Sequence, residues 1–259
     1  MAQNSQTVVR LSTQPKKWVY TINTKYYKPI ETRILSFHND KWSPYVYKWN
    51  AESSEAYLHP QGHSVPLDAI DRHERTIQFN YQIPGRPQCS ECHGGYNELN
   101  DTNPLGPSYL QTNIEVKANG KNINQMAYWL KNGLLATDAK MDIVTLSRER
   151  EYLHINCGHC HNQYGTANSS RLYLDKEVTG FFHLGFCKPS VAAGKGTLGL
   201  KYDIEPGVPE KSILIQRLKS TQASIKMPEI GRSLVDEHGV AMLENWIRQS
   251  TYSNNDCQK

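Results

Sequence analysis

The pattern Cys-x-x-Cys-His occurs twice in this chain of 259 residues, as Cys89-Ser90-Glu91-Cys92-His93 and as Cys157-Gly158-His159-Cys160-His161. The two copies use four of the six cysteines, so the fold must present two thiols and an imidazole together at each of two places. The pattern is typical of covalent haem c attachment, in which each thiol adds to a haem vinyl group and the histidine lies under the iron. The sequence therefore predicts two haem c groups, bound by Cys89, Cys92, His93, Cys157, Cys160 and His161.

Zinc is the main alternative cofactor, because paired Cys-x-x-Cys knuckles also bind zinc. Knuckles of one zinc module usually lie about 15 to 20 residues apart, whereas residues 93 to 156, that is 64 residues, separate Cys92 from Cys157. A zinc site also gives no reason for a histidine directly after each second cysteine. With 6 cysteines and 10 histidines, a random copy is expected in roughly one of two hundred such chains, so chance does not explain two copies.

Charge and hydropathy narrow the class of protein. The 29 basic and 25 acidic residues give a net charge of +4 without a long block of one sign, which argues against nucleic-acid binding. The absence of an 18-residue apolar run argues against an integral membrane segment. No secretory signal is visible after Met1, although haem c is attached outside the cytoplasm. We therefore expect a mature or truncated form of a periplasmic or cell-envelope protein.

Two cysteines lie outside the motifs. In an oxidising compartment Cys187 and Cys257 would pair as a disulfide that closes a long loop. Two separate structural thiols explain the sequence equally well.

The N-terminal third of the chain has the pattern of strands. From Thr76 to Ile83 apolar and polar residues alternate strictly, and two further apolar segments flank the turn pair Asn39-Asp40. Pro84-Gly85-Arg86-Pro87 then interrupts the pattern directly before the first motif. We expect a small antiparallel β module over residues 1–84, followed by a mainly helical region, and hence an α+β fold.

The helical region is predicted to repeat one plan, with a first haem unit over residues 85–145 and a second over 146–259. The expected elements are a helix with Ile123, Met126 and Leu130 on one face that stops at Gly133, and a helix capped by Ser147 that leads to Cys157. Two more are a helix from Pro209 to Lys219 and a last helix capped by Asp236, with Val240, Leu243 and Ile247 on one face.

The sixth iron ligand separates electron carriage from catalysis. Met227, in a Met-Pro step on a predicted loop, is the candidate for the haem at His161. For the haem at His93 the repeat favours Met141 over Met126, which helical spacing places in the core; His154, His159 or no protein ligand are the alternatives.

Several short segments together resemble a bacterial family of exported di-haem c-type cytochromes. They are Gly106-Pro107, Leu153 to Asn162, Cys187-Lys188-Pro189 with Ala192-Ala193-Gly194, Pro206-Gly207 and Met227 to Ser233. The likeness covers roughly residues 30 to 249. It implies a β-rich N-terminal region, haem on both motifs, and an axial-methionine loop around Met227.

The motifs and the resemblance predict a di-haem electron carrier with redox partner proteins and no catalytic residues of its own. A mild basic surface would favour an acidic partner. Two alternatives share these residues: a di-haem peroxidase-like oxidoreductase with an open iron site, and a zinc-stabilised binding module.

Overall fold

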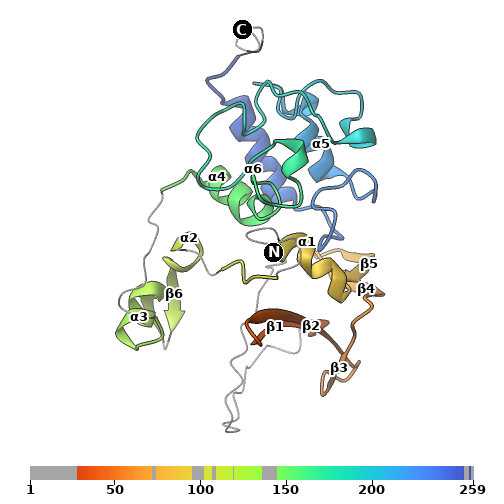
Figure 1. The fold of residues 1–259 in the computed structure, drawn as a ribbon, viewed down its shortest axis with the longest axis vertical. Coiled ribbons are helices and arrows are strands. Elements are labelled where there is room, and N and C mark those ends of the chain that lie inside the picture. Colours follow the sequence, from red (N-terminus) through yellow and green to blue (C-terminus); the bar gives the residue numbers. More distant parts are fainter. Residues whose placement is uncertain are drawn as a thin grey trace. The chain divides into compact units, whose positions relative to one another are not determined.

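The computed structural model describes residues 28–71, 74–94, 102–106, 109–118, 120–135, 145–253 and 257. It has an α+β fold of small antiparallel sheets and short helices (Figure 1). By its internal contacts the chain divides into two compact units, the first formed by Met1–Asn103 with Ser220–Val235 and the second by Pro104–Lys219 with Asp236–Lys259. Among the helices in these ranges, none has both the length and the apolar character needed to span a membrane.

The first unit contains an antiparallel sheet of three strands in the order β1 (Glu31–His38), β2 (Lys41–Trp49) and β3 (Ala56–Leu58). Asn39 and Asp40 connect β1 to β2 with φ angles of 51° and 58°. Positive φ at both central residues is the geometry of a type I′ turn, whose twist matches that of the strands it joins. The hairpin predicted around this pair is confirmed.

The strands β4 (His63–Ile70) and β5 (Thr76–Ile83) form a second antiparallel hairpin in the same unit. Along β5, Ile77, Phe79 and Tyr81 are half-buried whereas the polar residues between them are exposed. Ile83 at the end of the strand is completely buried. The alternation in the sequence therefore predicted both the strand and its buried face.

The first motif follows β5 almost directly. A short 3-10 turn, η1 (Arg86–Gln88), leads into helix α1 (Cys89–His93), and the backbone N–H of Arg86 donates to the carbonyl of Pro60 at 2.8 Å. Gly62 has a φ of 73°, and a Cβ on it would lie 2.7 Å from the backbone nitrogen of Gly85. This close backbone contact positions the start of the motif against the β3–β4 connection.

In the second unit, residues 109 to 131 form α2 (Tyr109–Thr112), the hairpin of β6 (Glu115–Ala118) and β7 (Lys121–Asn124), and α3 (Gln125–Lys131). The prediction that Ile123 lies on the helix is wrong, because Ile123 belongs to β7 and pairs with Val116. The side chain of Asn124 accepts a hydrogen bond from the N–H of Ala127 at 2.9 Å and so starts the helix at Gln125. Met126 is buried, as its spacing predicted.

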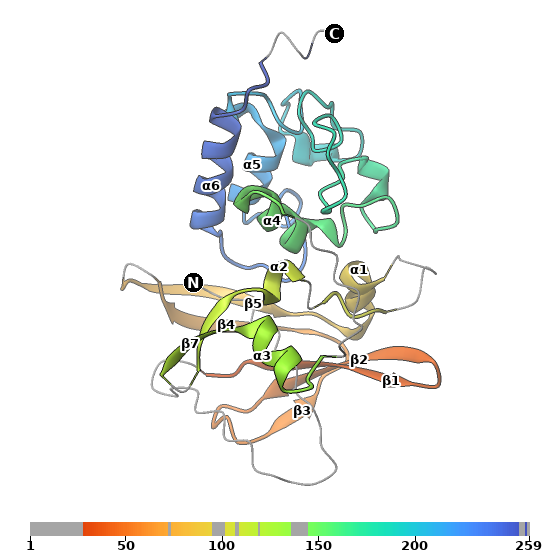
Figure 2. The same ribbon diagram turned by 90° about the vertical axis from the view of Figure 1, so that its left-hand side faces the viewer.

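In the rest of the second unit, α6 (Glu237–Arg248) packs against both α4 (Arg148–Leu153) and α5 (Ile213–Lys219), and Figures 1 and 2 show α5 beside α6. A π-helical turn, η2 (His154–Gly158), extends α4. Short 3-10 turns follow at η3 (Asn168–Ser170), η4 (Gly194–Thr197) and η5 (Pro209–Lys211). Fully buried apolar side chains from the helices and from the loops between them form the core: Leu153, Leu174, Phe186, Ile204, Ile215, Leu243 and Ile247.

Both predicted helix caps in this unit are confirmed. The Ser147 hydroxyl accepts from the N–H of Arg150 at 3.4 Å, and Asp236 accepts from the N–H of Gly239 at 3.0 Å. The helix predicted from Pro209 to Lys219 is observed as two pieces, η5 and α5, separated by Ser212 in extended conformation. Ser212 is buried and its hydroxyl donates to the carbonyl of Val208, which holds the break in place.

Cys187 and Cys257 form a disulfide with a Cα–Cα distance of 4.9 Å. The structure thus selects one of the two alternatives that the sequence left open. Next to it, Lys188 and Asp203 form an ion pair at 2.8 Å with side chains that are 3% and 9% exposed. Removal of either partner would destabilise the fold, because it would leave the other charge buried and uncompensated.

The two units do not coincide with the three segments expected from the sequence. Helix α1 with the first motif belongs to the same unit as β1 to β5, and so does the segment Ser220–Val235 that holds Met227.

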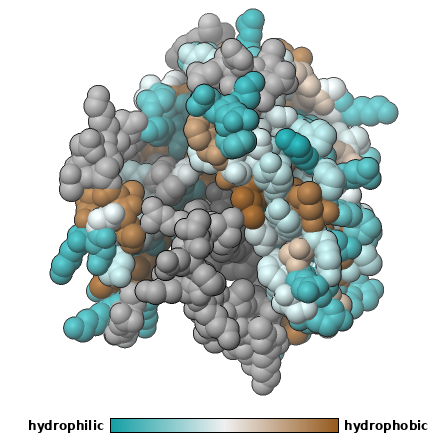
Figure 3. Space-filling view, turned by 60° about the horizontal axis from the view of Figure 1, so that its bottom comes forward, coloured by the Kyte–Doolittle hydropathy of each residue, from teal (hydrophilic) through white to brown (hydrophobic). Residues whose placement is uncertain are grey.

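On the face drawn in Figure 3, hydrophobic residues occur in separate small patches among hydrophilic ones.

Candidate functional site: two Cys-x-x-Cys-His motifs

Both motifs lie on helical backbone. The first is helix α1 itself, and in the second the N–H of His161 donates to the carbonyl of Cys157 at 2.8 Å. Residues at positions i, i+3 and i+4 share one face of a helix. Each motif therefore directs its two sulfurs and its imidazole to the same side, as attachment of one flat cofactor at two points requires.

The imidazole of the first motif is oriented by a backbone carbonyl. His93 Nδ1 lies 2.8 Å from the carbonyl oxygen of Asn103, and the N–H of Asn103 donates to the carbonyl of His93 at 2.7 Å. A carbonyl oxygen accepts hydrogen bonds and cannot donate them, so Nδ1 must carry the ring proton. The lone pair of the neutral ring is then on Nε2, the nitrogen that would coordinate a metal.

The second motif has the same arrangement. His161 Nδ1 lies 3.2 Å from the carbonyl oxygen of Leu172, and the N–H of Leu174 donates to the carbonyl of His161 at 2.8 Å. Burial lowers the pKa of His161 below its ordinary value, so its ring is neutral at pH 7. Neutral imidazole is the form that binds a metal ion.

The two motifs thus share a clamp made by backbone groups ten to thirteen residues downstream of the histidine. In metal sites, such a hydrogen bond to the second ring nitrogen fixes the tautomer and the ring orientation and raises the basicity of the ligand. Neither Asn103 nor Leu172 could be predicted from the sequence, because a backbone carbonyl leaves no residue-specific signal in a sequence.

Three residues on one face of the α4–η2 helix hold the clamping segment of the second motif, residues 172–178. Arg150 Nη2 donates to the carbonyls of Asp175 and Val178, each at 2.8 Å. His154 Nδ1 accepts from the backbone N–H of Lys176 at 3.2 Å. Gly158 lies so close that a Cβ on it would be 3.0 Å from the Cα of Asp175.

Asn162, which is 4% exposed, caps the C-terminal end of the helical turn that carries the second motif. Its side-chain amide donates to the carbonyls of Gly158 and His159 at 2.8 and 3.2 Å, and its oxygen accepts from the N–H of Tyr164 at 2.8 Å. Gly165 has no room for a side chain, since a Cβ would lie 2.2 Å from the carbonyl oxygen of Cys160. An Asn directly after the motif histidine, followed by a nearby Gly, is a signal for a helix end that sequence reasoning could have used.

The disulfide joins the two cysteines outside the motifs, so none of the four motif sulfurs takes part in it. Burial raises the pKa of Cys89, and burial together with the neighbouring Cys160 raises the pKa of Cys157 to about 12. At neutral pH these two sulfurs are therefore uncharged.

The methionine candidates are placed less directly. Met227 is half-buried and lies in Ser220–Val235, a segment of the first unit. Two hydrogen bonds stabilise this segment: Arg232 donates to the carbonyl of Ser220, and Lys226 donates to the carbonyl of Arg232 at 2.8 Å. His161 belongs to the second unit, so Met227 as its partner stays a prediction. Met141 lies outside the described residues.

The two histidines near the second motif differ in what they contact. Because His154 Nδ1 accepts a hydrogen bond, the proton of its neutral ring is on Nε2, which leaves that nitrogen without the lone pair that a metal needs. His154 is thus a packing residue of the helix rather than an iron ligand. His159 is half-buried within the motif.

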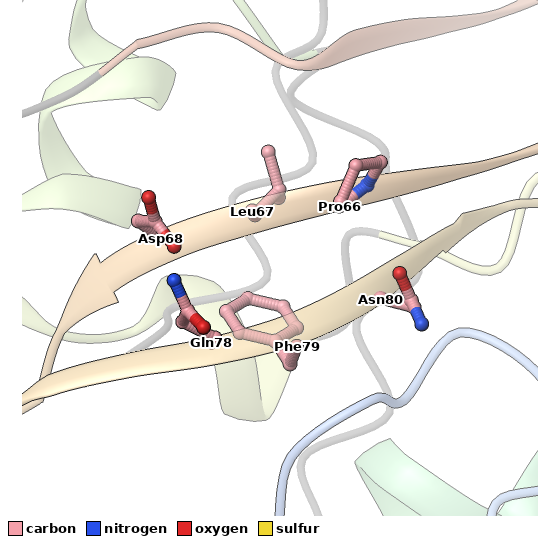
Figure 4. Close-up of a pocket in the computed structure, with 6 residues that line it drawn as sticks. All are labelled: Pro66, Leu67, Asp68, Gln78, Phe79 and Asn80. Carbon is pink, nitrogen blue, oxygen red and sulfur yellow. The ribbon is translucent and has the colours of Figure 1, made fainter.

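A shallow pocket on the β4–β5 hairpin lacks comparable chemistry. Figure 4 shows its lining, which consists of Pro66, Leu67 and Asp68 on β4 and Gln78, Phe79 and Asn80 on β5. Asp68 is the single ionisable group in that lining and faces the amide residue Gln78 across the strand pair. The two motifs remain the candidate functional site.

No family model, no curated protein and no solved structure matches the chain. The motif residues and the groups that orient them are therefore the basis for assigning a function.

Proposed function

We propose that this protein is a di-haem c-type cytochrome that carries electrons in the periplasm or cell envelope. The single observation that carries the proposal is that His93 and His161, each the last residue of a Cys-x-x-Cys-His motif, donate Nδ1–H to a downstream backbone carbonyl. This leaves Nε2 as the ligand nitrogen in both motifs, as a proximal haem ligand requires.

The spacing of the motifs favours haem over zinc, because 64 residues separate Cys92 from Cys157 and a histidine directly follows each second cysteine. The surroundings of Cys157 are compatible with haem. A thioether to a haem vinyl group is uncharged and apolar, so burial of this sulfur costs little. The intramolecular disulfide between Cys187 and Cys257 fits an oxidising compartment, where haem c is also attached.

A haem iron bound to each histidine would alternate between the ferrous and ferric states and so carry one electron. The residues of the chain would hold the two cofactors and orient their proximal ligands, of which His161 is half-buried. The electron donor and acceptor would be partner proteins.

The proposal is tested by intact mass and a pyridine haemochrome spectrum after export in a host with cytochrome c maturation machinery. The expected result is a mass gain of two haems and a c-type spectrum. The variant Cys157→Ala/Cys160→Ala should gain one haem. The matched control, Cys187→Ala/Cys257→Ala, removes the same number of sulfurs and should still gain two. An unmodified mass with bound zinc would contradict the proposal.

Met227 is proposed as the sixth ligand of the haem at His161. Methionine ligation raises the reduction potential of haem iron, so Met227→Ala should lower the potential of one haem and open its iron to cyanide. Met242→Ala, which removes a half-buried methionine from α6, is the control and should change neither. A potential and a cyanide affinity that are unchanged in Met227→Ala would remove Met227 from the ligand set.

A further inference from the structure

The hydroxyl of Ser170 lies beside the proximal histidine of the second motif. Ser170 Oγ is 3.4 Å from His161 Nδ1, the nitrogen that also faces the carbonyl of Leu172 at 3.2 Å. Ser170 ends the 3-10 turn η3 and is half-buried. The ring nitrogen opposite the metal-binding nitrogen therefore has two oxygen neighbours.

The other contacts of Ser170 decide the direction of this hydrogen bond. Its hydroxyl donates to the carbonyl of Ala167 at 2.7 Å, which uses its single proton. A hydroxyl oxygen then has two lone pairs left. One accepts from the backbone N–H of Leu172 at 3.2 Å, and the other faces His161 Nδ1. Ser170 thus acts as an acceptor for the ring N–H.

Ser170 also holds the carbonyl of Leu172, the other acceptor beside His161 Nδ1, in place. Arg171, the residue between Ser170 and Leu172, has a φ of 51°, which turns the chain sharply at this point. The hydrogen bond from the N–H of Leu172 to Ser170 Oγ holds this turn, and with it the Leu172 carbonyl. One hydroxyl therefore contributes to both oxygens around His161 Nδ1.

We propose that Ser170 sets the reduction potential of the haem at His161 by accepting a second hydrogen bond from Nδ1–H. The proposal rests on the proposed function, since it assumes a haem at His161. Acceptors on this N–H raise the basicity of the ligating nitrogen. A more basic nitrogen donates more electron density and favours the ferric state, so Ser170 lowers the potential. Ser170 is in this sense a positioning and tuning residue, because it acts through His161.

The test is a spectroscopic redox titration of the purified holoprotein and three variants. Ser170→Ala should increase the ferrous-to-ferric ratio of one haem about threefold at a fixed ambient potential, while the other haem titrates as before. Ser170→Thr keeps a hydroxyl and should restore the original ratio. Ser169→Ala removes the adjacent exposed hydroxyl and should leave both haems unchanged.

A second readout separates tuning from folding. The NMR resonance of the His161 ring N–H should move in Ser170→Ala and return in Ser170→Thr. If Ser170→Ala does not accumulate, Ser170→Cys takes its place, because its sulfur is a weak hydrogen-bond acceptor and must shift the ratio in the same direction.

The outcomes distinguish this proposal from the proposed function. A wild-type protein without haem would overturn the proposed function. A wild-type protein with two haems whose titration curves are identical in Ser170→Ala would overturn the role of Ser170 alone. A shift in Ser170→Ala that Ser170→Thr does not reverse would also overturn it, because the hydroxyl would then not be its cause.

Discussion

At the scale of single residues, the second motif needs a residue without a side chain at position 158. Gly158 has no side chain, and this absence lets the backbone of Asp175 approach the motif helix. Through this contact the segment 172–178 reaches the ring of His161. The first motif has Ser90 at the equivalent position, so the motif itself does not require a glycine there. Gly158 is instead required by the packing of the second motif against Asp175.

Gly158→Ala is expected to lower the free energy of unfolding by about 1 to 3 kcal/mol, the usual cost of an added methyl in a tightly packed place. Its Cβ would lie 3.0 Å from the Cα and 3.2 Å from the nitrogen of Asp175. Gly180→Ala is the control, because its Cβ would have no neighbour closer than 3.7 Å. Urea unfolding followed by circular dichroism measures both; equal losses in the two variants would contradict the packing argument.

His154 makes stability depend on pH. Burial and the positive charge of Lys176 lower the pKa of His154, and Asp175 opposes them in part. The ordinary pKa of histidine is about 6.5. When the pH falls below this value, His154 of the unfolded chain binds a proton that His154 of the folded chain does not yet bind. The free energy of unfolding should therefore be largest above pH 6.5 and should fall as the pH drops toward the folded pKa.

His154→Asn isolates this effect, because the Asn oxygen can take the place of Nδ1 as acceptor for the N–H of Lys176 but does not titrate. Urea unfolding between pH 7 and pH 5 should show a slope smaller by up to about 1.4 kcal/mol per pH unit in the variant. An unchanged slope would mean that another group binds the proton.

At the scale of elements, one carboxylate joins two helices. Asp236 caps α6 through the N–H of Gly239 at 3.0 Å and accepts from the hydroxyl of Tyr152 on α4, also at 3.0 Å. Gly239 allows this contact, since a Cβ there would lie 2.4 Å from the Tyr152 oxygen. The cap thus also sets where α4, which leads to the second motif, lies against α6.

Asp236→Ala should lower the free energy of unfolding by about 1 to 2 kcal/mol, because it removes a helix cap and the partner of Tyr152. Asp236→Asn keeps an oxygen for the N–H of Gly239 and should cost less. Denaturant unfolding of the two variants and of Tyr152→Phe separates the cap from the tyrosine contact. Equal losses in the alanine and asparagine variants would show that the cap contributes nothing.

At the scale of the whole molecule, the disulfide ties residue 257 to residue 187 across a sequence separation of 70. Closing a loop of this length lowers the entropy of the unfolded chain and stabilises the fold by about 4 kcal/mol in the chain-entropy model. The bond anchors the C-terminal end beside Lys188 and Asp203 in the core of the second unit.

Cys187→Ala/Cys257→Ala should therefore unfold at a clearly lower temperature than the wild-type protein. Scanning calorimetry with and without a thiol reductant checks this, because the reductant should lower the melting temperature of the wild-type protein and leave that of the variant unchanged. A wild-type melting temperature that is insensitive to reductant would contradict a stabilising disulfide.

Much of the local structure could be predicted because its causes lie within a few residues of each other. The turn at Asn39-Asp40, the alternation along β5 and the caps at Ser147 and Asp236 each depend on a period of two or on hydrogen bonds that span three residues. Ile123 was misplaced because the pairing of β7 with β6 outweighed helical spacing, which no local pattern reveals.

The motif spacing alone predicts which residues would hold two haems, since two thiols and an imidazole at fixed spacing share a face on any helical backbone. The groups that orient these residues follow from the tertiary structure. The carbonyls of Asn103 and Leu172 and the hydroxyl of Ser170 reach the rings of His93 and His161 because the chain turns back after each motif. The physical reason is that a backbone carbonyl is present in every residue, so its partner is chosen by the path of the chain and not by the residue type.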